Sequence, residues 1–545
     1  MIAGQGFHGW RRHPARERLD TMRSTPWKIT KKQISGKGGI VACQHWKAAE
    51  AGVSILESGG NAVDAAVAAA LVLDVVEPLR SGIGGGGYMV AMDGKTGEVR
   101  VLDFSVCASS KLRPEDYPLE EGADGDWFRW PRVRDGRNLR GYTSVCVPGA
   151  VAGLAEALRT LGTIPWSRII EPAISEAAAG MEVDWVFALN LAEFREDLLR
   201  YPESVAVWLP GGNLPPVLKD NKPFRLPLTA KLATLERLQK AGPDDFYSGE
   251  LGHALAEDLR RGGSPVDMDD LLGYRPIWKD PLRAQYRGWK LSLVPGNSAG
   301  PSLARALASL EASMQPDSPL PGPEASCHYA RACREEYAYR LRSMGESSTP
   351  FRFSEPSCTS NLCVVDRHGN VVALTNTILN LFGSKVTSPS LGTLLNNGLM
   401  WFDPVPGHPN SIAPGVRPLT NMSPFVAVAP GGESYGMGAA GGRTIFPTLL
   451  QLLSYVADYG MSLEEAFLFP RLDASTETIR VSAKAPEGVA ARIAEEYPVE
   501  IVLDNFLPSY FSYPSAVCHN PISGVNTGMA HHMSPWPAAA AEDLS

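Results

Sequence analysis

The sequence predicts a mixed α/β fold in which strands and helices alternate along one long chain. Short β-prone runs, such as residues 38–43 and 364–372, are bounded by glycine and other turn residues. Alanine- and leucine-rich segments between such runs carry helix start and stop signals. With 545 residues, the chain is too long for one simple core, so we expect two lobes or one large composite domain.

The composition is typical of a soluble globular protein, with 20% charged and 44% hydrophobic residues. The net charge is −8 and the signs are scattered, so no nucleic-acid-binding face is indicated. The longest apolar run, residues 62–76, is interrupted by Asp64 and Asp74. It therefore predicts a buried helix and no membrane span.

The N-terminal residues 1–30 lack the apolar segment of a secretory signal, and Met22 is an alternative start to Met1. We therefore expect a cytoplasmic protein. The eight cysteines form no Cys-x-x-Cys pair, and disulfides are not expected in that compartment. Most of them are expected to be small core residues.

The first predicted elements form a strand and two helices. Residues 38–43 predict the strand, and a helix follows from about His45 to Glu57. Ser58-Gly59-Gly60 is a helix stop. Asn61 is then placed to cap a second helix, which runs to about Val76 before Pro78. Its many alanines predict close packing on its neighbours.

A glycine-rich run, Ser81–Gly87, leads into a predicted strand over residues 88–92. It is not a phosphate-binding loop, because no Lys-Ser/Thr follows and the glycines lead into a strand. Two interpretations remain open: a tight backbone crossing inside the core, or close approach of the backbone to a ligand. Another strand is predicted over residues 98–104.

The middle of the chain is predicted to be mainly helical. Helices are expected over residues 148–162 and in several segments up to about residue 272, then a strand over residues 289–294. Further helices begin near Ser302 and cover about residues 328–342. Residues 343–357 contain Gly, Pro and several serines, and they form the best internal boundary in the chain.

Residues 358–377 predict a β-hairpin whose turn, Asp366–Asn370, tolerates positive φ. With the turn centred near His368, Thr359 lies opposite Thr377, with Cβ atoms roughly 5 Å apart. Thr359 would be a nucleophile if cleavage of the Cys358–Thr359 bond freed its α-amino group to act as the base. The alternative is an ordinary hairpin with a cross-strand threonine pair.

Residues 435–445 predict a strand, a glycine turn at Gly441-Gly442 and then a helix from about Pro447. Backbone N–H groups of such a turn can form an oxyanion hole, although a plain strand-to-helix turn has the same pattern. No spacing of His, Cys or Asp predicts a metal site. His531 and His532 are expected at the surface.

Together these stretches resemble the γ-glutamyltransferase (glutathione hydrolase) family of N-terminal-nucleophile hydrolases over about residues 36–480. The motifs that carry the resemblance are spread over both halves of the sequence. They are Gly59–Ala65, Gly84–Met89, Pro148-Gly149, Val151–Gly153, Thr359–Asn370, Thr377, Leu395–Asn397, Arg417–Leu419, Met422–Pro424 and Gly441-Gly442.

The resemblance implies a proenzyme that cuts itself between Cys358 and Thr359. A tail (1–35) would precede a large chain (36–358) and a small chain (359–545), which associate as a heterodimer in one four-layer αββα sandwich. The nucleophile falls on Thr359 and its supporting hydroxyl on Thr377. The oxyanion hole falls on Gly441 and Gly442, and no cofactor or metal is implied.

The sequence departs from the family at positions that hold the γ-glutamyl group. The positions of the family's arginine, acidic residue, glutamine, asparagine and serine pair are occupied by Ser105, Trp401, Gly398, Leu379 and Thr420-Asn421. A buried ammonium or carboxylate without partners costs several kcal/mol. These replacements therefore predict an acyl group without an α-ammonium.

The favoured hypothesis is an amidohydrolase that acts on a non-γ-glutamyl amide, either a small acid amide or one with an apolar acyl chain; divergent relatives include oxamate amidohydrolase and cephalosporin acylase. Arg80 and Arg443 are candidates to bind an acyl carboxylate, and each also fits a surface or structural ion pair. Two alternatives are a γ-glutamyltransferase with altered anchors and a non-catalytic binding protein that keeps the fold. Interaction with nucleic acid or membranes is not expected.

Overall fold

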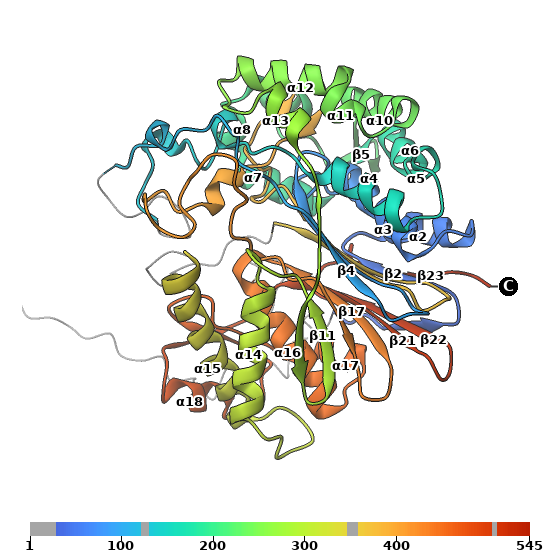
Figure 1. The fold of residues 1–545 in the computed structure, drawn as a ribbon, viewed down its shortest axis with the longest axis vertical. Helices are drawn as coiled ribbons and strands as arrows, with labels where there is room; N and C mark the ends of the chain where they lie inside the picture. Colours follow the sequence, from blue (N-terminus) through green and yellow to red (C-terminus); the bar gives the residue numbers. More distant parts are fainter. Residues whose placement is uncertain (1–28, 121–129, 346–357, 504–509, 545) are drawn as a thin grey trace, which may run out of the picture.

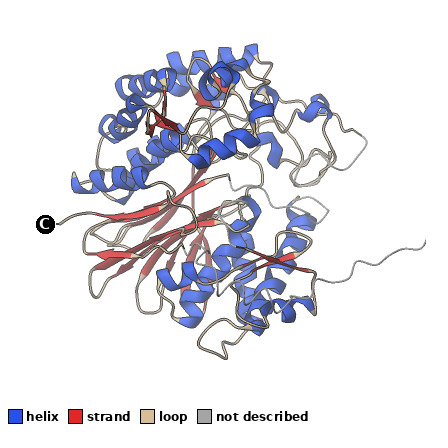
Figure 2. Ribbon diagram, turned by 180° about the vertical axis from the view of Figure 1, so that it is seen from behind, coloured by secondary structure: helices blue, strands red, loops and turns tan. Residues whose placement is uncertain are grey.

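Two antiparallel sheets are stacked face to face between two layers of helices, as predicted (Figures 1 and 2). The structure is a computed structural model, and it describes residues 29–120, 130–345, 358–503 and 510–544. None of the helices within these ranges combines the length and apolar character needed to cross a membrane.

The first sheet, named here the hairpin sheet, contains the predicted hairpin at its centre. Its seven strands are, in spatial order, β23 (Ala538–Ala541), β2 (Ile40–Cys43), β12 (Ser360–Val365), β13 (Val371–Thr377), β3 (Gly86–Met92), β4 (Val99–Phe104) and β9 (Ile277–Lys279).

The second sheet, named here the facing sheet, packs against the hairpin sheet. Its seven strands are, in spatial order, β1 (Ile34–Gly36), β22 (Val525–Ala530), β21 (Tyr513–Asn520), β17 (Ser434–Ala440), β16 (Phe425–Val428), β11 (Trp289–Leu293) and β10 (Leu282–Tyr286).

Helices from the first half of the chain cover the hairpin sheet (Figure 1). They include α2 (Trp46–Glu57), α3 (Ala62–Val76), α4 (Ala150–Leu161), α6 (Glu171–Ala179), α10 (Thr229–Ala241), α12 (Glu250–Arg261) and α13 (Met268–Gly273). The facing sheet is covered by α14 (Gly300–Ser313), α15 (Pro323–Tyr339), α16 (Ile445–Tyr459), α17 (Leu463–Leu468) and α18 (Val489–Ala494).

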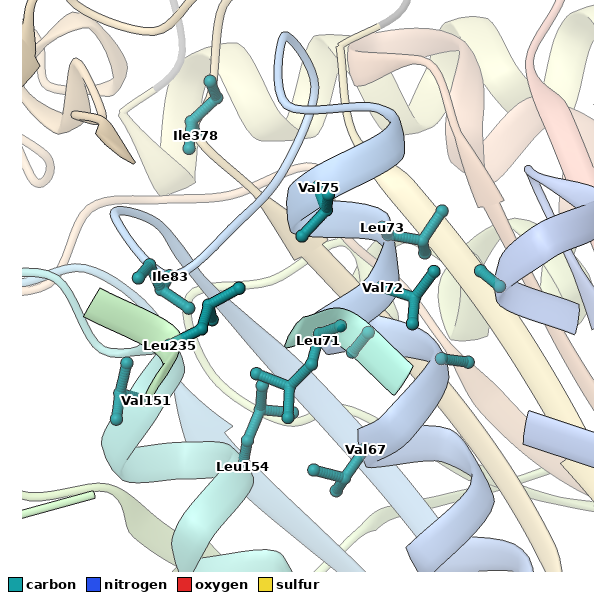
Figure 3. Packing of buried hydrophobic residues seen from close by; sticks show 14 of the residues in the cluster. Val67, Leu71, Val72, Leu73, Val75, Ile83, Val151, Leu154, Leu235 and Ile378 are labelled. Atoms are coloured by element: carbon teal, nitrogen blue, oxygen red, sulfur yellow. The ribbon is translucent and has the colours of Figure 1, made fainter. Parts of the chain in front are cut away.

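Helix α3 lies at the centre of the hydrophobic core between the hairpin sheet and its helices. Asn61 caps it as predicted, accepting hydrogen bonds from the amides of Val63 and Asp64 in a capping box. Its small side chains let it lie close to the hairpin sheet, and fourteen of its fifteen residues are buried. Figure 3 shows Val67 and Leu71 packed with Leu154 of α4, near Leu235 of α10.

The glycine run serves close backbone packing, one of the two interpretations left open. A Cβ atom at Gly85 would lie 2.1 Å from the carbonyl oxygen of Thr377, and one at Gly87 would lie 1.9 Å from that of Thr375. Gly84 meets the carbonyl of Leu394 in the same way, at 2.1 Å. Any side chain here would push strand β13 and its threonines out of place.

Two expectations need correction. Residues 34 and 35 are not part of a tail, because they lie in strand β1, which pairs with β22. His531 and His532 are not at the surface; they are 1% and 4% exposed. They lie where the chain crosses from β22 in the facing sheet to β23 in the hairpin sheet, and the ring of His531 contacts Tyr513 of β21.

The predicted internal boundary lies mainly outside the described residues, which resume at Cys358 after residue 345. Before it, α15 ends at Tyr339 and continues as a π-helical turn, Arg340–Met344. The eight cysteines are free, and seven of them are buried, as expected for small core residues.

Candidate active site

The β12–β13 hairpin has the predicted register. Asp366 holds its turn by accepting hydrogen bonds from the amides of His368 (2.9 Å) and Asn370 (3.0 Å). Ser360 pairs with Asn376, so Thr359 stands opposite Thr377. The two threonine hydroxyl oxygens are 3.3 Å apart.

Thr359 is held between a second hydroxyl and the peptide bond that precedes it. Its hydroxyl donates a hydrogen bond to the carbonyl oxygen of Cys358. Thr377 Oγ1 also accepts a hydrogen bond from the Leu379 amide at 2.9 Å, which fixes its position. Thr359 is 1% exposed and Thr377 is fully buried, so water is largely excluded from both hydroxyls.

A buried polar network lies behind the threonine pair. Ser81 Oγ donates to Ser360 Oγ at 2.8 Å, and Ser360 Oγ lies 3.4 Å from a carboxylate oxygen of Glu77. Glu77 also forms an ion pair with Arg80 at 3.1 Å. Burial outweighs these partners and raises the pKa of Glu77 to about 7. No sequence signal marks the side chains of Glu77, Ser81 or Ser360 as parts of the site.

The glycine turn follows strand β17. Gly441 and Gly442 have φ of +149° and +56°, values that favour glycine, and α16 starts three residues later at Ile445. Thr444 Oγ1 donates to the carbonyl of Gly441 at 2.9 Å and lies 2.6 Å from Ser512 Oγ. The turn is thereby held by side chains from two segments.

The glycine turn reaches the same end of the sandwich as Thr359. Gly436 packs against Val371, and Gly438 against Asn361, whose amide oxygen would lie 2.1 Å from an added Cβ. Moving toward the C-terminus of β17 therefore means moving toward the start of β12. Gly441, three residues beyond Gly438, is brought to the level of Thr359, two residues before Asn361.

The predicted pocket residues Leu379 and Trp401 belong to one buried apolar cluster, 3% and 6% exposed. Val106 and Cys146 join them, and both leave no room for a side chain at Gly398. Leu379 and Trp401 thus present apolar side chains. Leu379 has a φ of +83°, a strained value for leucine that holds its amide against Thr377.

Two neighbouring asparagines hold the segment that carries Trp401. Asn396 accepts hydrogen bonds from the amides of Cys146 (3.0 Å) and Gly398 (2.9 Å) and donates to the carbonyl of Gly84. Asn397 accepts from the amide of Asn380 at 3.0 Å. The two asparagine side chains therefore bind backbone groups and fix the segment that leads to Trp401.

Ser105 faces an acidic residue. Its hydroxyl donates to Asp103 at 2.7 Å, and Asp103 in turn forms ion pairs with Arg417 and, at 2.7 Å, with Lys279. Burial opposes ionisation of Asp103, but the two cations outweigh it and hold its pKa below the usual value. Arg417 and Lys279 thus neutralise the negative charge of Asp103 beside Ser105.

Thr420 and Asn421 both contact a buried arginine. Arg340 donates to Asn421 Oδ1 at 3.0 Å and to the carbonyl of Thr420 at 3.4 Å. Arg340 also donates to Ser302 Oγ at 2.9 Å and is itself fully buried. No sequence signal marked Arg340, because its partners come from segments about 40 and 80 residues away.

The two candidate arginines have different surroundings. Arg80 is 6% exposed, and besides its ion pair with Glu77 it lies over the ring of Tyr513, 5.4 Å from its centroid. Arg443 lies over the ring of Tyr337 at 4.9 Å, and its carbonyl accepts a hydrogen bond from the Tyr337 hydroxyl. Arg80 is thus tied to the Thr359 network through Glu77.

Within the described part of the chain, no group of three or more His, Cys, Asp or Glu side chains gathers in a way that holds a metal. The arrangement offers instead a buried hydroxyl, a supporting hydroxyl and a glycine turn.

Comparison with known proteins gives the family. The profile of the family described as gamma-glutamyltranspeptidase matches residues 48–353 and 342–499. The chain is 33% identical over 517 residues to the acylase ACY 1 proenzyme of Pseudomonas sp. (strain SE83), covering 88% of this chain and 90% of that protein. It is 30% identical over 514 residues to the glutathione hydrolase proenzyme of Bacillus subtilis (strain 168), covering 85% of each.

The fold is shared with a solved structure. The cephalosporin acylase from Bacillus halodurans superposes with a TM-score of 0.82, covering 96% of this chain and 99% of that one, at 23% identity. At 23% identity, this match shows that the two proteins share a fold. The family profile and the relatives, which extend over most of the sequence, show that the chain belongs to the gamma-glutamyltranspeptidase family.

Proposed function

We propose that the protein is a self-cleaving amidohydrolase whose nucleophile is Thr359. The observation that carries this proposal is the position of the Thr359 hydroxyl, between the Thr377 hydroxyl and the carbonyl of Cys358. The two relatives found by sequence, from Pseudomonas sp. and Bacillus subtilis, are described as proenzymes: the first of an acylase, the second of a glutathione hydrolase.

Maturation uses the contact between Thr359 and Cys358. The Thr359 Oγ attacks the Cys358 carbonyl carbon, the C–N bond breaks, and an ester forms while the threonine nitrogen takes up a proton. Water then hydrolyses the ester, which leaves a carboxylate on Cys358 and a free α-amino group on Thr359. The products are a large chain that ends at Cys358 and a small chain that begins at Thr359, held together as a heterodimer.

Turnover uses the freed amino group, which titrates near pH 8 and can accept the Thr359 hydroxyl proton. Thr359 Oγ attacks the amide carbonyl, and the N–H groups of Gly441 and Gly442 bind the resulting oxyanion, worth about 3–4 kcal/mol per donor in comparable sites. The amino group returns the proton to the leaving amine. Water or an acceptor amine then releases the acyl group.

The substrate is a small-molecule amide whose acyl group lacks an α-ammonium. Trp401 and Leu379 supply apolar surface where an amino acid head group would need charges. A cation buried against such a surface without partners costs several kcal/mol. The similarity to an acylase supports this choice. The cytoplasmic location stays a prediction.

The test compares purified, processed protein on a panel of amides, with glutaryl- and oxalyl-type amides against γ-glutamyl-p-nitroanilide and glutathione. The uncut Thr359→Ala protein is the blank. We expect turnover of amides without an α-ammonium at higher kcat/KM than of the γ-glutamyl compounds. Efficient turnover of the γ-glutamyl compounds alone would show that the pocket replacements still hold a glutamyl group.

A further inference from the structure

A group of buried, mainly basic side chains lies at the Thr359 end of the sandwich and has no part in the mechanism above. His531 and His532 belong to the crossover between β22 and β23, and Arg471 precedes strand β18 (Leu472–Asp473). Arg80 approaches from the glycine run, and Lys31 holds the crossover through the carbonyls of Ser534 and Pro537.

His531 has unused hydrogen-bonding capacity. It is 1% exposed, and neither of its ring nitrogens has a hydrogen-bond partner among the described residues. Its ring rests against Tyr513, with centroids 4.4 Å apart, and Nδ1 of His532 is also without a partner there. Because an unsatisfied buried donor costs about 1–3 kcal/mol, such groups in native proteins usually await a ligand or ordered water.

The surroundings of His531 are positively charged. Burial first, and then His532, Arg471, Lys31 and Arg80, all lower its pKa well below the usual value. The imidazole is therefore neutral at pH 7 and keeps one N–H as a donor. An N–H donor beside the buried Arg80 and Arg471 guanidinium groups favours an anion, and the two cations disfavour an ammonium group.

This group adjoins both halves of the reaction centre. Tyr513, whose ring contacts the His531 ring at a tilt of 53°, pairs with Ala440, the residue before Gly441. Arg80 lies over the same Tyr513 ring. The Arg80 carbonyl accepts a hydrogen bond from the Ile378 amide at 3.1 Å, directly after Thr377.

Maturation clears space beside this group. In the uncut chain Cys358 is 4% exposed, and its Sγ lies 3.5 Å from the carbonyl oxygen of Arg80. Thr359 is 1% exposed, so a substrate reaches its hydroxyl only after Cys358 has moved away. The space that Cys358 leaves adjoins the Arg80 carbonyl.

We propose that His531, together with Arg80 and Arg471, binds a carboxylate group of the substrate beside Thr359. The inference rests on the proposed amidohydrolase function and adds the substrate class: amides that carry a carboxylate. The imidazole N–H and the guanidinium groups donate charge-assisted hydrogen bonds to the carboxylate. The carboxylate belongs either to the acyl group or to the amine that leaves.

Two matched substrate pairs separate these sources. For the acyl group, glutaryl-p-nitroanilide is compared with pentanoyl-p-nitroanilide. For the leaving amine, pentanoyl-4-aminobenzoate is compared with pentanoyl anilide. The measured quantity is the ratio of kcat/KM within each pair, with processed protein at one pH and ionic strength. We expect the carboxylate to raise kcat/KM by roughly tenfold or more in one of the two pairs.

Variants of His531 test whether this residue causes the difference in kcat/KM between the two members of a pair. His531→Phe keeps the aromatic packing on Tyr513 but removes both nitrogens, and it should bring the ratio close to one. His531→Gln keeps an N–H donor and should retain most of the preference. The matched control is His328→Phe on helix α15: His328 also has a buried Nδ1 without a partner, but it lies in the outer layer of the facing sheet.

The outcomes are distinct. If neither pair shows a carboxylate preference, or if His531→Phe lowers kcat/KM equally for both members of a pair, the inference is overturned while the amidohydrolase proposal stands. If wild-type protein neither cuts itself nor hydrolyses any of these amides, the proposed function itself fails. Appearance of two chains on a denaturing gel shows that each variant has folded before its ratio is measured.

Discussion

The Oγ1 atom of Thr359 lies 3.3 Å from the Oγ1 atom of Thr377, across the two central strands of one sheet. The first threonine precedes strand β12 and the second ends strand β13, so a single hairpin sets their separation. We expect Thr377→Val to slow both self-cleavage and turnover by roughly fivefold or more, because a hydrogen bond worth about 1 kcal/mol is lost.

Thr375→Val is the matched control for this variant. Thr375 lies two residues earlier on the same strand, and its hydroxyl donates to Asn361 Oδ1 at 2.9 Å. Both variants should lose stability, but only Thr377→Val should change the rate of band conversion in a time course on a denaturing gel. Equal rates for Thr377→Val and wild type would remove Thr377 from the mechanism.

Self-cleavage should produce a small chain that begins Thr-Ser-Asn-Leu. Intact mass spectrometry of purified protein measures both chains, and Thr359→Ala should remain a single chain because it has no hydroxyl to attack the Cys358 carbonyl. Thr359→Ser keeps a hydroxyl and should still cut. A small chain that starts at Cys358 would assign the nucleophile to a thiol.

The two turn glycines should differ in their tolerance of alanine. An added Cβ at Gly441 would lie 2.3 Å from Ser512 Oγ and 2.7 Å from Thr444 Oγ1, whereas one at Gly442 meets nothing within 4 Å. Gly441→Ala should therefore shift the turn and lower kcat by roughly tenfold or more, a large part of what one oxyanion donor supplies. Gly442→Ala should cost about 1 kcal/mol of backbone strain.

Gly460→Ala calibrates that strain. Gly460 ends helix α16 with a φ of +64°, close to the +56° of Gly442, and its Cβ position is also open. Thermal unfolding should show similar losses of stability for Gly442→Ala and Gly460→Ala. A kcat loss for Gly441→Ala no larger than for Gly460→Ala would argue against an oxyanion hole at this turn.

Glu77 should make the stability of the uncut protein depend on pH. Its pKa is raised from 4.5 to about 7, so between these values the folded chain holds a proton that the unfolded chain has released. Folding stability therefore falls as pH rises from about 4.5 to about 7, and it levels off above pH 7. The free energy of unfolding should drop by up to a few kcal/mol across this range.

The comparison uses Thr359→Ala with and without Glu77→Gln, so that self-cleavage does not interfere. Urea unfolding at several pH values should give a steeper fall between pH 5 and 7 for the variant that retains Glu77, since glutamine does not titrate. Parallel curves would mean that Glu77 is ionised in the folded protein throughout.

Local signals explain how much of the fold and site could be predicted. The turn at Asp366–Asn370 fixes the hairpin register, and hence the Thr359–Thr377 pair, within 20 residues. Asn61 and Pro78 mark the ends of α3 because capping and a missing amide act over one helical turn. The motifs around these elements carried the family resemblance.

Non-local pairing explains what could not be predicted. Strand β23 consists of four alanines, which have little strand propensity, and it pairs with β2 almost 500 residues earlier. Without that pairing nothing in the sequence indicates that the chain crosses between the sheets, so the sequence predicts His531 and His532 at the surface. From the sequence, Glu77 is an ordinary polar residue at the end of a helix. Its place in the site depends on Ser360, 283 residues away, and on its ion pair with Arg80.

The order of strands in the hairpin sheet determines what self-cleavage does to refolding. Strands β23, β12 and β13 come from the segment after residue 358. Strands β2 and β3 come from the segment before it, and β2 lies between β23 and β12. Once the bond is cut, the halves stay interleaved, and neither can leave without breaking sheet hydrogen bonds on both sides.

If the bond before Thr359 is cut as proposed, it joins the two halves only while the chain folds for the first time. The uncut chain folds in a unimolecular reaction, whereas the cut protein, once denatured, has to reassemble from two molecules at a rate that depends on concentration. Cleavage at this site would therefore convert a protein that can refold by itself into one whose lifetime is set by its first unfolding event.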